Sequence, residues 1–138
     1  NAYEKMKKSV TPRFTQELSN TISKITDSKY TNIVPNDEQG LLVELDNGNY
    51  EPASKLSVGT IDQLYLSLRL SMVEELSEEN MPIILDEVFA YYDDERLKNT
   101  LLFLNEKCNN HQILIFSCTD REKEMLEKLK IKFNYINL

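Results

Sequence analysis

The second half of the chain alternates short apolar runs with helical repeats, and this alternation limits the folds that it can adopt. Apolar residues at helical spacing predict helices over 60–76, 94–108 and 121–129. Strand-like runs lie at 83–85, 113–116 and 131–136. Strands that alternate with helices favour a mostly parallel sheet with crossover helices. We therefore predict an α/β fold.

Two of these helices have clear apolar faces. In the first, the predicted buried face contains Ile61, Leu64, Tyr65, Leu68, Met72 and Leu76. In the second, the inward positions are Leu97, Leu101 and Leu104. Both helices are expected to pack against the sheet through these side chains.

The first half of the chain predicts a helix followed by a β-hairpin. An apolar stripe runs from Tyr3 to Ile25, and Thr11-Pro12 indicates that the helix restarts there. Strand-like runs follow at 30–34 and 41–45. Asn47-Gly48 then predicts a tight turn, because both residues tolerate positive φ. Tyr50 and Glu51 begin the return strand, and Pro52 ends it.

Length and charge exclude several classes of protein. The 138 residues fit one domain, and their net charge of -7 argues against a surface that grips DNA by itself. The sequence contains neither an apolar run long enough for a membrane span nor a signal peptide, so we expect a cytoplasmic protein without a membrane partner. Cys108 and Cys118 are expected to be buried or half-buried free thiols.

Two adjacent carboxylates follow the first apolar run of the second half. Asp86 and Glu87 would leave the carboxyl end of a parallel strand, where functional groups of α/β proteins gather. One acid of such a pair can hold Mg²⁺, often through water, and the other can orient or deprotonate a water molecule. The alternative is a strand end that reaches solvent, followed by a helix-capping acid.

A second candidate site precedes the helix over 60–76. The Ser57 hydroxyl, the Gly59 amide and the positive end of the helix could converge on one phosphate. The alternative is purely structural, because Thr60 and Gln63 have the spacing of a capping box.

Four motifs in order resemble one protein family. Residues 56–64 resemble the signature motif of ATP-binding-cassette (ABC) ATPases, in the form typical of the SMC-like branch with its YhaN-type proteins. Residues 82–87 resemble the Walker B strand, 88–93 the D-loop, and 112–118 the strand that leads to the switch residue. The resemblance implies that 1–28 is the carboxyl-terminal end of a coiled coil and that 29–138 is the carboxyl-terminal lobe of an ABC head.

The resemblance also implies roles for single residues and two cofactors, ATP and Mg²⁺. The signature residues Ser57, Val58, Gly59 and Thr60 would reach the γ-phosphate of ATP held by a second head. Asp86 would hold Mg²⁺ through water, and Glu87 would be the general base. Asp93, in the D-loop, would cross the interface between two heads.

The chain departs from the family at the switch position. The family usually has a histidine where this chain has Thr119, and His111 precedes the strand, at the opposite end of the predicted sheet. Thr119 could hydrogen-bond a phosphate oxygen or the attacking water, or it could cap the next helix with Glu122. This substitution bears on the rate of hydrolysis rather than on ATP binding.

A phosphate loop is missing from the sequence. Such a loop needs two glycines five residues apart, followed by Lys and Ser or Thr, and none of Gly40, Gly48 and Gly59 fits. The resemblance therefore implies a partner, an amino-terminal lobe that carries Walker A. Without it, apolar side chains around the hairpin or at one sheet edge should be uncovered, and the isolated chain could dimerise through them.

Three functions remain open on the sequence. The first is half of an ABC-type ATPase head, serving DNA repair or chromosome maintenance and touching DNA only through the full assembly. The second is a non-catalytic dimerisation or interaction module derived from such a head. The third is an acidic metal-binding protein that uses Asp86, Glu87, Asp93 and Asp94.

Overall fold

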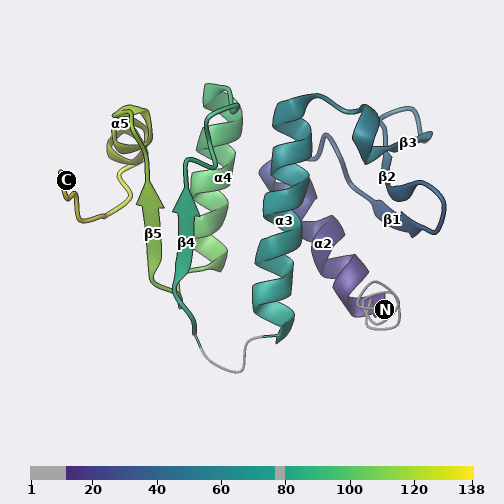
Figure 1. Ribbon diagram of the computed structural model, residues 1–138, viewed down its shortest axis with the longest axis horizontal. Helices are drawn as coiled ribbons and strands as arrows, with labels where there is room; N and C mark the ends of the chain where they lie inside the picture. Colours follow the sequence, from purple (N-terminus) through teal and green to yellow (C-terminus); the bar gives the residue numbers. More distant parts are fainter. Residues whose placement is uncertain (1–11, 77–79) are drawn as a thin grey trace. The chain divides into compact units, whose positions relative to one another are not determined.

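A computed structural model describes residues 12–76 and 80–138 of the chain. The chain forms two compact units, Asn1–Ser77 and Glu78–Leu138, which Figure 1 shows from purple to teal and from teal to yellow. In the described residues, the first unit contains two helices and a small sheet, and the second contains two parallel strands and two helices.

In its described residues, the first unit begins with helix α2, Pro12–Ile25. The predicted cap Thr11 lies outside the described residues, so the restart of the helix stays a prediction. The predicted stripe positions Tyr3, Met6 and Val10 lie outside the described residues. The unit continues with strands β1 (Ile33–Asn36), β2 (Gly40–Glu44) and β3 (Tyr50–Pro52), a 3₁₀ turn η1 (Ala53–Lys55) and helix α3 (Val58–Leu76). The strands form an antiparallel sheet in the order β1-β2-β3.

The turn between β2 and β3 confirms the Asn-Gly prediction but not its detailed geometry. Gly48 has a φ of 78°, and its amide donates to the carbonyl of Leu45 at 2.8 Å. Asn47, by contrast, does not have a positive φ. Its side-chain oxygen instead accepts from the amide of Asn49 at 2.9 Å. Only the glycine therefore provides the left-handed conformation in this turn.

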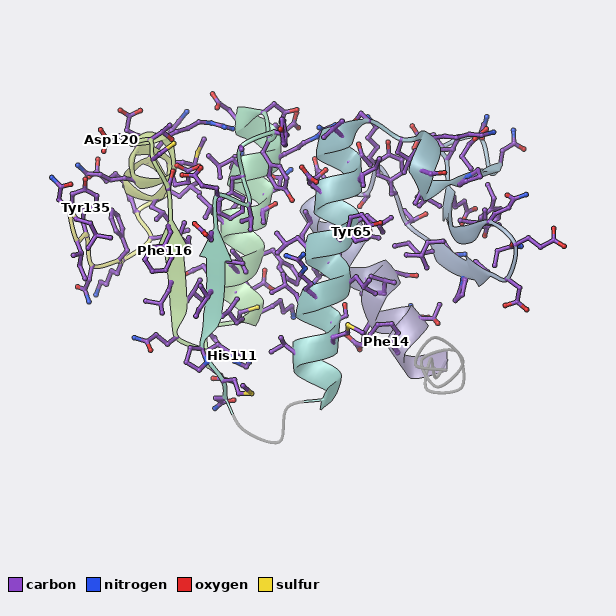
Figure 2. All side chains as sticks on the ribbon, in the orientation of Figure 1. Phe14, Tyr65, His111, Phe116, Asp120 and Tyr135 are labelled. Carbon is purple, nitrogen blue, oxygen red and sulfur yellow. The ribbon has the colours of Figure 1, made fainter. Side chains whose placement is uncertain are left out.

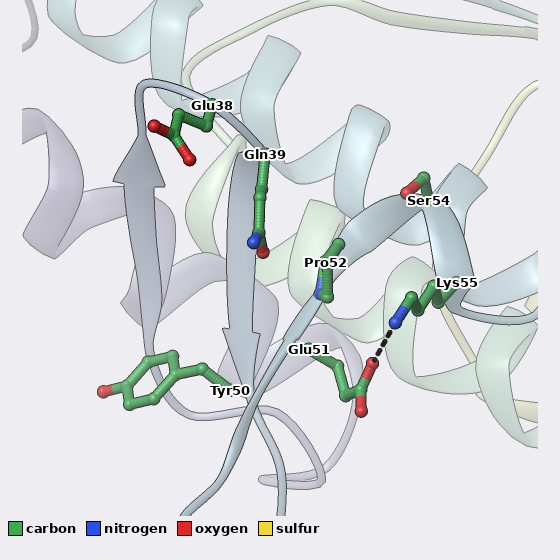
Figure 3. A pocket seen from close by; sticks show the side chains of 7 residues that line it. All are labelled: Glu38, Gln39, Tyr50, Glu51, Pro52, Ser54 and Lys55. Carbon is green, nitrogen blue, oxygen red and sulfur yellow. Dashed lines mark ion pairs between the residues drawn. The ribbon is translucent and has the colours of Figure 1, made fainter.

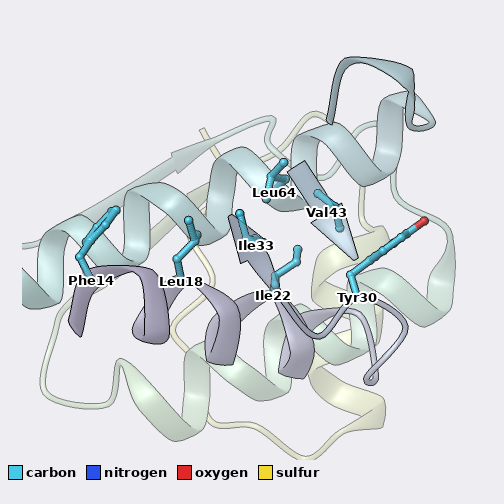
Figure 4. Packing of buried hydrophobic residues seen from close by; sticks show 7 residues of the cluster. All are labelled: Phe14, Leu18, Ile22, Tyr30, Ile33, Val43 and Leu64. Atoms are coloured by element: carbon cyan, nitrogen blue, oxygen red, sulfur yellow. The ribbon is translucent and has the colours of Figure 1, made fainter. Parts of the chain in front are cut away.

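One hydrophobic core joins the helices and the sheet of the first unit. Figure 4 shows side chains from both helices meeting those of β1 and β2. The cluster consists of Phe14, Leu18, Ile22, Tyr30, Ile33, Val43 and Leu64. The apolar stripe of α2 supplies three of them at spacings of four residues, as its sequence predicts.

A polar stripe on α3 faces α2, and this corrects the predicted buried face. Gln63, Ser67 and Ser71 are 1%, 0% and 2% exposed, whereas Tyr65 is 56% exposed and projects from the helix (Figure 2). The Gln63 amide donates to the carbonyl of Ile25 at 3.3 Å, and Ser71 donates to the Thr21 hydroxyl at 3.3 Å. Small and hydrogen-bonded side chains allow the helices to approach without unsatisfied polar groups.

The second unit contains strands β4 (Ile83–Asp86) and β5 (Ile113–Phe116) and helices α4 (Asp94–Lys107) and α5 (Arg121–Lys128). The two strands pair in parallel, and Asp86 lies opposite Phe116 at their carboxyl ends. Leu97, Leu101 and Leu104 are buried, as predicted for α4. The structure is therefore mixed α/β.

Two parts of the predicted sheet are wrong. The fold is not mostly parallel, because the three-stranded sheet is antiparallel and, among the described strands, only β4 and β5 are parallel. Residues 131–136 form no strand, although their composition favours one. A strand is stable only when a neighbouring strand satisfies its backbone groups, and the described residues offer none to this segment.

Among the residues that the structure describes, no helix has the length and apolar character needed to cross a membrane.

Candidate functional site

The signature residues form the first turn of α3. The helix begins at Val58, so Val58 and Gly59 lie within it rather than in a loop ahead of it. Ser57 is exposed and precedes the helix, while Val58 is 58% exposed and Gly59 is buried. The first amides of a helix have no partner within it and carry a partial positive charge. The arrangement therefore suits an anion that approaches the turn from solvent.

The predicted capping box is wrong, because the cap lies one turn earlier. The amide of Thr60 donates to the Ser57 hydroxyl at 3.4 Å and to the Ser57 carbonyl at 2.9 Å. The hydroxyls of Ser57 and Thr60 share a hydrogen bond of 2.8 Å. Gln63, assigned to the box, instead donates to the carbonyl of Ile25. Ser57 thus both caps the helix and presents an oxygen to solvent.

The two predicted acids leave β4 together at the carboxyl end of the parallel pair. Both side chains are exposed, and the amide of Glu87 continues the ladder by donating to the Phe116 carbonyl at 3.0 Å. Glu87 has a φ of 49°, in the left-handed region that residues with a Cβ rarely adopt. Such a conformation costs about 1–2 kcal/mol and tends to be retained at functional positions.

The Glu87 carboxylate is held by the loop that follows β5. The backbone amide of Cys118 donates to Glu87 Oε1, a contact between residues 31 apart in the sequence. The hydrogen bond and charge of Glu87 raise the pKa of the exposed Cys118 thiol above its ordinary value, with smaller contributions from desolvation and the charge of Glu122. Cys108 is buried, so the expectation of two buried or half-buried thiols is correct for Cys108 and wrong for Cys118.

The switch position Thr119 lies in the same loop, but its hydroxyl is engaged. It donates to Glu122 Oε2 at 3.1 Å, and the Ser117 hydroxyl donates to the same oxygen at 2.6 Å. Thr119 is not the cap of α5, because Asp120 occupies that position without a side-chain cap bond. The predicted cap is therefore wrong, although Thr119 does contact Glu122, and the role at a phosphate oxygen or the attacking water stays a prediction.

The D-loop is fixed at both ends by contacts that the sequence did not indicate. Asp93 caps α4 by accepting from the amide of Arg96 at 2.8 Å. Arg121 donates to the carbonyls of Phe89, at 3.5 Å, and Tyr92, and it pairs with Asp94 at 3.3 Å. A lone arginine at a helix start has no local signal for such a role, so only the structure reveals it.

Aromatic packing completes the D-loop. The rings of Phe89 and Tyr92 meet edge to face, with centroids 5.5 Å apart, and both side chains are buried. Tyr91 between them is 69% exposed. The loop thus has a packed base and one projecting aromatic side chain.

Two other features do not form a competing site. His111 Nδ1 shares a hydrogen bond of 2.8 Å with the carbonyl of Met81. It lies at the amino end of the strand pair, whereas Phe116 lies at the carboxyl end (Figure 2). No group of three or more His, Cys, Asp or Glu residues in the described part of the chain could hold a metal ion. The predicted cluster of Asp86, Glu87, Asp93 and Asp94 is therefore not assembled.

A hollow of about 560 Å³ beside the hairpin was also considered as a site. Figure 3 shows its lining, with an ion pair of 3.7 Å between Glu51 and Lys55. The lining residues are Glu38, Gln39, Tyr50, Glu51, Pro52, Ser54 and Lys55. None of them is a predicted site residue, and their exposed polar side chains do not form the apolar cleft typical of a ligand pocket.

One face of the parallel strand pair is apolar and uncovered. Ile84, Leu114 and Phe116 are 64%, 37% and 43% exposed, and their register places them on the same face. Ile83 and Leu85, on the opposite face, are buried. The sequence predicted uncovered apolar side chains around the hairpin or at a sheet edge, whereas these lie on a face of the strand pair.

Comparison with solved structures identifies the fold as that of an SMC head. One similar structure comes from a study of ATP-driven dimerisation and DNA-stimulated activation of SMC ATPases. The match has a TM-score of 0.66 and 14% identity, and it covers 81% of this chain and 71% of that chain. The SMC head domain from Thermotoga maritima gives a TM-score of 0.63 and 18% identity, covering 84% of this chain and 41% of the other.

At the level of sequence, the chain is 31% identical to YhaN of Bacillus subtilis over 134 residues. This covers 95% of the chain but only 14% of YhaN. No protein-family model matches the chain. The relative and the fold together confirm the resemblance to SMC-like, YhaN-type ATPase heads that the motifs indicate.

Proposed function

We propose that this chain is the carboxyl-terminal lobe of an ATP-hydrolysing SMC-like head, with Glu87 as the general base. The observation that carries the proposal is the placement of the Glu87 carboxylate. It sits beside Asp86 at the carboxyl end of the parallel strands, on a left-handed backbone, and accepts from the Cys118 amide. A structural acid has no need of this costly arrangement.

The held carboxylate suits a base that acts on water. One oxygen of Glu87 accepts from the Cys118 amide, which fixes the orientation of the group. The other oxygen can then accept a proton from a water molecule aligned with the γ-phosphate. Because Glu87 is exposed here, the water would be enclosed only when the remaining parts of the head are present.

Asp86 is the residue that would hold Mg²⁺. Its exposed carboxylate offers the hard oxygen ligand that this ion prefers, and Mg²⁺ commonly keeps several waters beside one or two carboxylates. The ion would neutralise charge on the phosphate oxygens. The donor chemistry of the site therefore fits the group that the motifs imply.

The signature turn would act on a second head. Ser57, Val58, Gly59 and Thr60 form an exposed helix start with a hydroxyl and backbone amides, which suits the γ-phosphate of ATP bound elsewhere. We propose that two heads pair around ATP, with the D-loop at Asp93 and its projecting Tyr91 at their interface. ATP favours pairing because the paired state binds it better.

We further propose that an amino-terminal lobe with Walker A covers the exposed face of β4 and β5. Ile84, Leu114 and Phe116 form an apolar surface that a larger sheet or a covering helix would bury. The chain spans a small part of the length of YhaN, which leaves room for such a lobe. We place residues 1–28 at the returning end of a coiled coil and 29–138 in the lobe.

DNA enters the proposal only through the assembly. The related SMC ATPases are described as activated by DNA, whereas this chain has a net charge of -7. We therefore propose work on chromosomes or in DNA repair for the complete protein, with the basic contacts supplied outside this chain.

The test is ATPase activity of the head completed with a Walker A lobe. We expect Glu87→Gln to lower turnover roughly 100- to 10,000-fold while ATP still drives head pairing, because only the proton acceptor is lost. Glu95→Gln, an exposed acid in the first turn of α4, is the control and should leave turnover unchanged. Wild-type turnover in Glu87→Gln would contradict the assignment of the base.

One observation favours a second function, a non-catalytic interaction module. The switch position carries Thr119, and its hydroxyl is bound to Glu122. A head of this kind would bind ATP and pair with a second head but would not hydrolyse the ATP. ATP-driven pairing without measurable turnover in the unmutated head would select this function, and the absence of nucleotide binding would reduce it to a structural module.

A further inference from the structure

Glu122 is the one charged side chain buried within the described part of the chain, with 7% exposure. Burial of a carboxylate is costly unless hydrogen bonds replace its water. The hydroxyls of Ser117 and Thr119 both donate to Oε2, at 2.6 Å and 3.1 Å. Hydrogen bonds to a charged group are among the stronger ones in proteins.

These bonds close a compact loop around Cys118. The Ser117 hydroxyl, besides donating to Glu122, accepts from the amide of Thr119 at 3.2 Å. Residues on both sides of Cys118 are therefore anchored to one buried oxygen. The amide between them is the donor to Glu87 Oε1.

We propose that Glu122 is a positioning residue for Glu87, acting through the Ser117–Thr119 segment that it anchors. The inference rests on the proposed function of Glu87 as the base. The inference gives Thr119 a role different from that of a switch histidine. The Thr119 hydroxyl binds Glu122, and the Ser117–Thr119 segment contacts the proposed base through the backbone amide of Cys118. Loss of Glu122 releases the segment and leaves the Glu87 carboxylate without its fixed donor.

The first test measures alkylation of Cys118 by iodoacetamide in the full chain at one mildly alkaline pH. Cys118 is exposed and Cys108 is buried, so the reagent distinguishes them. Because Glu87 raises the pKa of the Cys118 thiol, we expect the wild-type reaction to be slow. We expect Glu122→Ala and Glu87→Gln each to accelerate labelling several-fold, and the control Glu124→Ala, which changes an exposed residue of α5, to have no effect.

The double variant separates positioning from a general loss of structure. If Glu122 acts on the Cys118 thiol mainly by positioning Glu87, Glu122→Ala adds little to labelling in the Glu87→Gln background, because the direct charge effect of Glu122 is the smaller one. Equal acceleration in both backgrounds, or none in the wild type, would overturn the proposal. If Glu122→Ala also exposes Cys108, the double change Ser117→Ala, Thr119→Val provides the same test with Glu122 in place.

The second test uses the completed head. Glu122→Ala is expected to lower kcat about tenfold with KM for ATP unchanged, since orientation of the base rather than nucleotide binding is affected. A rise in KM with kcat unchanged would contradict the inference. If the completed head shows no turnover at all, the proposed function fails, whereas the labelling result still reports whether Glu122 positions Glu87.

Discussion

The two units hold their candidate site residues in different ways. In the first unit, the signature turn is the start of a long helix, and neighbours in the sequence define it: Ser57 caps the amide of Thr60, three residues away. In the second unit, the acids and the D-loop are held by residues 29 to 32 positions away, with Cys118 on Glu87 and Arg121 on Phe89 and Tyr92.

This difference between local and long-range contacts indicates which site should change when the head pairs with other parts of the protein. A helix start keeps its geometry as long as the helix exists, so the phosphate site proposed at the signature turn would be formed in advance. The proposed base and the D-loop depend on one loop and the start of α5. Changes that reach this segment would alter hydrolysis and pairing together, while the signature turn stays intact.

The largest expected effect comes from mixing two inactive heads. Ser57→Arg blocks the signature turn and Glu87→Gln removes the base, so each completed head alone should lose most of its turnover. If the signature acts on the partner's ATP, a mixed pair keeps one site with both functions. Random pairing in a two-fold dimer then restores about a quarter of wild-type turnover. If mixing restored no turnover, Ser57 and Glu87 of one head would act on the same ATP, and the proposal that the signature turn acts on the partner's ATP would be wrong.

A smaller effect is expected from the polar stripe that anchors α3. Gln63→Leu removes the donor to the carbonyl of Ile25 and leaves that group unsatisfied in the helix interface. We expect the free energy of unfolding in urea to fall by about 1–3 kcal/mol. Arg69→Leu, at an exposed position of the same helix, is the control. Equal losses of unfolding free energy in the two variants would show that the buried hydrogen bond of Gln63 does not contribute to stability.

The matching change in the second unit is Arg121→Lys. Lysine keeps the charge near Asp94 but cannot donate to two carbonyls at once through a planar fork. We expect amide hydrogen exchange to accelerate about tenfold over 88–93 and to stay unchanged in α3. Lys128→Arg, an exposed position on α5, is the control. Unchanged protection of the D-loop would show that its aromatic packing suffices.

The smallest effect concerns the backbone at Glu87. Glycine adopts a φ of 49° without penalty, whereas alanine pays about 1 kcal/mol. Glu87→Gly should therefore be at least as stable to urea as Glu87→Ala, despite the greater flexibility of glycine in the unfolded chain. At Asp86, within β4, glycine should be less stable than alanine. The same order at both positions would argue against strain at Glu87.

Much of the local structure could be predicted because neighbouring residues encode it. The spacing of apolar residues located α2, α4, β4 and β5, and Asn47-Gly48 located the turn. The order of four motifs indicated the SMC-like head that the comparisons confirm. The capping box failed at the same scale, because Ser57 and Thr60 compete for the same helix start and spacing alone did not choose between them.

Only the tertiary structure decided what lies across the fold. The expectation of an apolar buried face on α3 missed that Gln63, Ser67 and Ser71 are buried against α2. A polar side chain is buried only where another group can hydrogen-bond to it, and that group can lie far away in the sequence. Residues 131–136 have a strand composition, but the described residues offer them no strand to pair with.

The candidate site divides in the same way between local and distant information. The sequence by itself determined which carboxylates leave β4, since this follows from local order along the chain, but it did not determine which residue caps α3. The hydrogen bonds from the Cys118 amide to Glu87 and from Arg121 to the D-loop join segments that are distant in the sequence. The spacing of apolar residues contains no information about such long-range contacts.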